Sequence, residues 1–343
     1  MRLLICLGLL AGAASAKTLV HDTHLATTAK FQFVSDPWMN LHHFLYASAT
    51  QEKSDTVPQG HGVEMPDRAP PETMSEDERA TWTAAVEFYR VNLGAKRLTF
   101  DAQLIALKRR HWDTSERRPA ETPMHAQIEA VIASAMPVYL HHWWPAHDRS
   151  NRAWLAAVLP IVQRWETRFA DELGRIYGGQ WPAEPVRVDL TAYTDYYGAY
   201  NTGEPHVVLA TQVAKNAPPQ GIELLFHEAS HSESLGNGLY SRVADAATQA
   251  GVRLPRDLWH VLIFVTTGEL TRRYFAEEGG DNYVPYAVGQ KLYADTSPWG
   301  RYHRLAQQFW VPKLDAPAAE RLAAYDLMVR ENARLIAPAA GQK

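Results

Sequence analysis

The chain has 343 residues, of which 46% are hydrophobic and 21% charged, so it is too apolar to be a disordered chain. Its 34 basic and 38 acidic residues give a formal net charge of −4, which leaves no basic excess to neutralise nucleic-acid phosphates. We therefore expect no nucleic-acid partner.

The N-terminus has the features of a signal peptide. Arg2 precedes an apolar run over residues 3–13, and Ala14-Ser15-Ala16 forms a small-residue cleavage site. The run is too short to cross a bilayer as a helix, and no later apolar stretch reaches about 18 residues. We assign residues 1–16 to a signal peptide, expect an exported protein that is periplasmic or secreted, and expect no transmembrane segment.

Helical patterns dominate residues 17–180. Ser75 and Glu78 have the spacing of a capping box, and Thr122-Pro123 combines an N-cap with proline in the first turn. The predicted helices cover residues 76–93, 98–110, 123 onward, and 148–177. This N-terminal region is therefore expected to be mainly helical.

The pattern changes over residues 181–343. Residues 186–190 alternate with a period of two, and residues 206–211 form a second predicted strand. Helices are predicted over residues 222–236, 240–250, 256–276, 285–294, 299–311 and 317–336. We expect an α+β protein, mostly helical, with a small sheet preceding the central helix. The two regions form either separate lobes or one continuous domain.

Residues 227–231 read His-Glu-Ala-Ser-His, the pattern H-E-x-x-H. Four residues make about one helical turn, so His227 and His231 project from one face of a helix. Neutral imidazole is a good ligand for Zn²⁺, which lowers the pKa of bound water so that a neighbouring base can take its proton. The pattern predicts one zinc ion per chain, with Glu228 as the general base.

A third protein ligand is needed, and the predicted helix over residues 256–276 offers two candidates. Glu269 follows an apolar run and has Gly268 beside it, which would let another segment approach closely. His260 is the alternative. Nine residues separate the two, so they lie about 180° apart on an unbroken helix and cannot both bind one ion. We favour Glu269 and keep His260 open.

This arrangement resembles the gluzincin group of zinc metallopeptidases, which have a zincin-like fold. The resemblance implies that His227, His231 and Glu269 bind zinc and that Glu228 is the general base. It also implies that the strand before the motif helix, here near residues 206–211, pairs with an extended substrate.

The C-terminal part of the chain also resembles an uncharacterised group of exported bacterial proteins. The stretches that carry this resemblance are the 227–231 motif, Thr267-Gly268-Glu269 and Tyr283-Val284-Pro285-Tyr286. Together they span about 40% of the chain.

Two further sets of side chains bear on the site. Hydrolysis creates an oxyanion that a hydrogen-bond donor can stabilise, and the candidates are Tyr283, Tyr286, His260 and His303. A histidine doublet at residues 141–142 invites a second metal site. Because adjacent helical residues do not face together and no carboxylate pair accompanies them in the sequence, we expect ring packing there instead.

The sequence thus predicts an exported zinc-dependent hydrolase, a metallopeptidase that cleaves peptide or amide bonds of a peptide or protein substrate. One alternative is a zinc-binding protein of zincin-like fold with a binding rather than a catalytic role. Another is a helical scaffold whose histidines are structural.

Overall fold

The computed structural model describes residues 23–50, 65–112, 122–203, 205–280 and 282–337. The expected signal peptide, residues 1–16, lies outside the described residues. Among the residues that are described, no helix is both long and apolar enough to cross a membrane.

The protein is α+β and mostly helical, as predicted. Its principal helices are α1 (Pro37–Thr50), α2 (Glu76–Asn92), α3 (Ala102–Trp112), α4 (Pro123–His142), α5 (Trp144–Tyr177), α6 (Gln220–Ala229), α7 (Glu233–Gln249), α8 (Leu258–Glu277), α9 (Tyr286–Gly289), α10 (Pro298–Leu305) and α11 (Ala318–Ile336). Its strands are β1 (His24–Thr27), β2 (Phe31–Val34), β3 (Val186–Thr191), β4 (Ala199–Asn201) and β5 (His206–Ala210).

The five strands form one mixed sheet in the order β1-β2-β3-β5-β4. Strands β2, β3 and β5 run parallel, whereas β1 and β4 pair antiparallel at the two edges. Two strands come from the N-terminal region and three from the C-terminal region, so the sheet joins residues 17–180 to residues 181–343.

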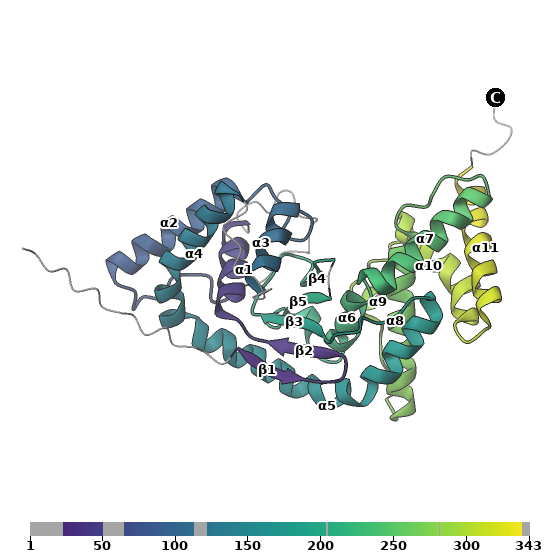
Figure 1. The fold of residues 1–343 in the computed structure, drawn as a ribbon, viewed down its shortest axis with the longest axis horizontal. Helices are drawn as coiled ribbons and strands as arrows, with labels where there is room; N and C mark the ends of the chain where they lie inside the picture. The colour runs from purple at the N-terminus through teal and green to yellow at the C-terminus, as the bar shows by residue number, and fades with distance from the viewer. Residues whose placement is uncertain (1–22, 51–64, 113–121, 204, 281, 338–343) are drawn as a thin grey trace, which may run out of the picture.

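The sheet lies between two groups of helices, α1–α4 on one side and α6–α11 on the other, and the long helix α5 runs past it to connect them (Figure 1). Side chains alternate between the two faces of the sheet. Val207 and Leu209 belong to the apolar core that includes α6 and α8, whereas Val208 and Tyr200 belong to the core formed by α1–α4. Both helical groups are therefore anchored on the same sheet.

Local sequence signals fixed several helix ends. Ser75 and Glu78 form the predicted capping box of α2, and the Thr122 side chain accepts a hydrogen bond at the start of α4. Several boundaries differ from the prediction, including the start of α7 at Glu233 and the end of α9 at Gly289. Helix α5 begins at Trp144 rather than at residue 148, and the motif helix α6 ends at Ala229 rather than continuing to residue 236.

Candidate metal centre

Helices α6 and α8 bring three histidines together. The Nε2 atom of His227 lies 3.2 Å from that of His231 and 3.3 Å from that of His260. Any two of the candidate ligand atoms of these residues lie within 4.8 Å of each other. Three imidazole nitrogens that converge on one point form a donor set for a single metal ion.

Helix packing fixes these positions. Phe264, one turn after His260 on α8, stacks on the His227 ring with centroids 3.6 Å apart. His231 lies just beyond the end of α6, where the Trp259 ring meets its imidazole edge-on at 5.5 Å. His227 is buried, while His231 and His260 are partly exposed, so the cluster is open on one side.

The distances fit zinc. Two nitrogens bound at about 2.0–2.1 Å in a tetrahedron lie about 3.3–3.4 Å apart. Burial lowers the pKa of all three histidines, to about 4 for His260, so their nitrogens are unprotonated and able to bind a cation at neutral pH. Three protein ligands leave a fourth tetrahedral position for water or substrate.

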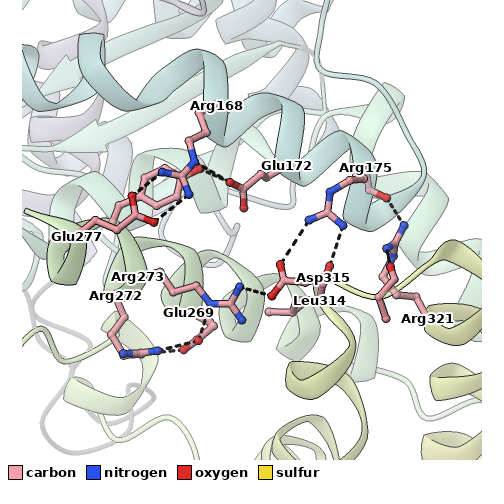
Figure 2. Close-up of polar contacts among 12 residues, drawn as sticks. Arg168, Glu172, Arg175, Glu269, Arg272, Arg273, Glu277, Leu314, Asp315 and Arg321 are labelled. Carbon is pink, nitrogen blue, oxygen red and sulfur yellow. Dashed lines mark hydrogen bonds and ion pairs between the residues drawn. The ribbon is translucent and has the colours of Figure 1, made fainter.

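The structure does not bring Glu269 to the histidines, which corrects our preference for it as the third ligand. Its carboxylate accepts hydrogen bonds of 2.8 Å from both Arg272 and Arg273, and Arg273 also bonds to Asp315 (Figure 2). The physical reason is the helix period: α8 is continuous, so Glu269 faces the side opposite to His260. The residues that could hold a metal here are therefore three histidines, unlike the two histidines and one glutamate that the gluzincin resemblance implies.

Glu228 lies next to the cluster and is almost fully buried, with 8% exposed. Burial raises its pKa to about 8, the nearby Asp195 adds to the rise, and a hydrogen bond from the backbone of Asn201 opposes it. Asn201 belongs to β4, so the edge strand holds this carboxylate in place. A divalent cation nearby would return the pKa of Glu228 toward its ordinary range.

Glu223 is a buried carboxylate that the sequence analysis missed. It lies one turn before His227 on α6, and its Oε2 accepts hydrogen bonds from the Tyr283 hydroxyl (2.6 Å) and the Tyr286 backbone N–H (2.8 Å). Gly268 of α8 lies against its other oxygen: a Cβ at Gly268 would be 3.1 Å from Glu223 Oε1. The spacing of 223, 227 and 231 at intervals of four was the signal that could have revealed it.

The four candidate donors to an oxyanion differ in what they contact. His260 belongs to the donor cluster, the Tyr283 hydroxyl is bonded to Glu223, and His303 stacks on Tyr293 at 4.0 Å. Tyr286 remains: burial raises the pKa of its hydroxyl, and the negative charges of Glu228 and Glu223 raise it further. Its phenol therefore stays protonated in the field of Glu228.

The structure also corrects the prediction of which strand could pair with a substrate. Strand β5, which corresponds to residues 206–211, is interior, because β3 pairs with one side of it and β4 with the other. The edge strand next to α6 is β4, which the sequence analysis did not predict.

No family model, no curated protein and no solved structure matches this chain. Inference about its function therefore depends on the chemistry of its own residues.

Proposed function

We propose that the protein is an exported zinc-dependent hydrolase with a zincin-like active site that cleaves peptide or amide bonds. The observation that carries this proposal is the convergence of His227, His231 and His260, with Glu228 beside them at the edge of a sheet. Zinc held by the three imidazoles would polarise a carbonyl and make water acidic enough to lose a proton near neutral pH.

Each part of the site has its own role in this proposal. Glu228 accepts the proton of the attacking water and passes it to the leaving amine, as a general base and then a general acid. Tyr286 donates a hydrogen bond to the oxygen on which negative charge develops. Strand β4 offers its outer edge to an extended substrate, in the manner of strand addition.

The chemistry of the surroundings favours this function over a purely structural role for the histidines. A histidine cluster with no charge near it could be explained by packing alone. Here the cluster is partly exposed and has a buried carboxylate and a buried phenol at its side, which a structural cluster would not need.

The test is metal analysis followed by an assay on an unfolded protein substrate. We expect about one tightly held zinc ion at this centre and cleavage that stops when a chelator removes it. Zinc binding without cleavage of any peptide or protein would support the alternative, a binding role. A preparation that holds no divalent metal and gains none from solution would refute the proposal.

A further inference from the structure

A second group of metal-ligating side chains lies far from the first, where the start of α2 meets the end of α4 at one extremity of the molecule (Figure 1). Glu78 Oε1 is 3.3 Å from His141 Nδ1 and 3.3 Å from His142 Nε2. All three ligand atoms lie within 4.8 Å of one another. No carboxylate accompanies His141 and His142 in the immediately neighbouring sequence. Glu78, on helix α2, supplies one.

The end of the helix lets the two adjacent histidines converge. His142 is the last residue of α4. His141 presents its near nitrogen, Nδ1, whereas His142 reaches the same oxygen with its far nitrogen, Nε2, and the two rings lie 4.3 Å apart. Side chains that diverge by about 100° on the helix therefore still meet at Glu78.

The His142 nitrogen is the observation that points to a ligand. Its side chain is only 5% exposed, and Nε2 is buried without a hydrogen-bond partner among the described residues. Although it lies 3.3 Å from Glu78 Oε1, the geometry is not that of a hydrogen bond. A buried polar atom left in this state is costly, and a cation bound to the His142 nitrogen would satisfy it.

The charge and distances suit such an ion. The second carboxylate oxygen, Oε2, accepts hydrogen bonds of 2.9 Å from the backbone and hydroxyl of Ser75, which holds the carboxylate still. The first oxygen, Oε1, is in hydrogen-bond contact with His141 Nδ1 at 3.3 Å, a contact that a bound ion would replace. The 3.3 Å separations match two edges of a tetrahedral zinc site, about 3.3 Å. The C-terminal end of α4 also favours a positive charge.

We propose that Glu78, His141 and His142 form a second metal site for a divalent ion of the zinc type, which ties the start of α2 to the end of α4. Because His141 is 71% exposed, the remaining coordination positions face solvent. We expect this site to be weaker than the three-histidine centre and to stabilise the α2–α4 pair when filled, because an ion that binds only the folded state favours it.

The experiment is a Zn²⁺ titration of the metal-free full chain, with bound zinc measured by equilibrium dialysis and elemental analysis. The test variant is Glu78→Gln, because glutamine keeps the capping box with Ser75 and is a poorer zinc ligand. His142→Ala is the second variant. His24→Ala is the matched control, since His24 is exposed and outside the cluster.

We expect the wild type and the His24→Ala variant to bind one more equivalent of zinc than Glu78→Gln and His142→Ala, and to show a rise in Tm that those two lack. This result does not require the three-histidine centre to bind zinc. If the wild type bound zinc only at the Glu78 site, Glu78→Gln and His142→Ala would still bind less zinc than the wild type. Equal zinc binding by the wild type and both test variants would overturn the proposal.

Discussion

The Nε2 atoms of His227 and His260 lie 3.3 Å apart although 33 residues separate them in the chain. No periodicity within one helix could indicate this contact, because it is created by the packing of α6 against α8. Phe264 is the side chain that sets it, since its ring lies on His227 while it shares a face of α8 with His260.

The third ligand can be tested by a pair of substitutions on α8. We expect His260→Ala to lose tightly bound zinc and to have a lower Tm, because a ligand of the folded state is removed. Glu269→Ala should keep its zinc and lose only the ion pairs with Arg272 and Arg273, which are partly open to solvent and contribute little to stability. Elemental analysis of both variants decides the assignment, and loss of zinc from Glu269→Ala alone would reverse it.

Much of the local structure followed from the sequence, and the long-range structure did not. The capping box at Ser75 and the N-cap at Thr122 depend on residues three positions apart, so the pattern contains the whole interaction. Strands β1 and β2 have only four residues each. They pair with each other, and β2 also pairs with β3, where 155 residues separate the partners Phe31 and Val186. Short strands of this kind are stabilised by their partners and leave little local signal.

The same distinction applies to the site. The H-E-x-x-H spacing is local, so His227, His231 and Glu228 were found together. The choice between His260 and Glu269 was a choice between two faces of α8, and only the packing of that helix shows which face meets α6. Glu78 and the histidine doublet are a further case, because their contact joins two helices.

Glu228→Gln tests the role of the carboxylate. Glutamine has nearly the same shape but cannot take a proton, so zinc content and Tm should be retained. Activity should fall by about 10²–10⁴-fold, as is typical when acid–base catalysis is lost. The measurement is the cleavage rate at equal zinc occupancy. A variant that loses its zinc would show that Glu228 is a ligand instead.

Tyr286→Phe tests the proposed hydrogen-bond donor. We expect zinc to be retained, kcat to fall by about 10²-fold or more and KM to change little, because the hydroxyl acts on charge that develops during the reaction. Tyr197→Phe is the control, since the Tyr197 hydroxyl lies 3.5 Å from Arg97 near α3 and makes no contact with the centre. An equal loss in both variants would exclude a specific role for Tyr286.

Gly268→Ala tests whether close packing against Gly268 holds the segment that carries Tyr286 in place. An added Cβ would lie 2.8 Å from the Pro285 Cβ and 3.1 Å from Glu223 Oε1, so the segment must move. We expect a loss of about 1–3 kcal/mol in the free energy of unfolding, together with reduced kcat. In the matched control, Gly289→Ala, the nearest atom is 3.8 Å away, and stability should change little. Denaturant unfolding of both variants measures the difference, and equal stability would contradict the tight contact at Gly268.

A buried lysine makes the stability of the fold depend on pH. The Lys108 side chain is fully buried between α3 and the sheet, where Nζ donates a 2.7 Å hydrogen bond to the Leu98 carbonyl and lies 4.6 Å from the centre of the Tyr200 ring. Burial lowers its pKa from 10.5 to about 7, an effect that Asp195 and Asp101 oppose. The folded state therefore holds this amine in its neutral form more readily than the unfolded chain does.

The sign of the pH dependence follows from the proton count. Between about pH 7 and pH 10.5 the unfolded chain keeps a proton on Lys108 that the folded chain has released. Where the unfolded state binds more protons, the free energy of unfolding rises with pH, so this residue stabilises the fold increasingly from about pH 7 to 9. In Lys108→Met the amine is absent, and this contribution to the slope disappears. Lys313→Met, at an exposed lysine, is the control and should keep the slope of the wild type. Urea unfolding at about pH 7, 8 and 9 measures it, and a constant difference between wild type and Lys108→Met at all three values would show that the amine does not titrate in this range.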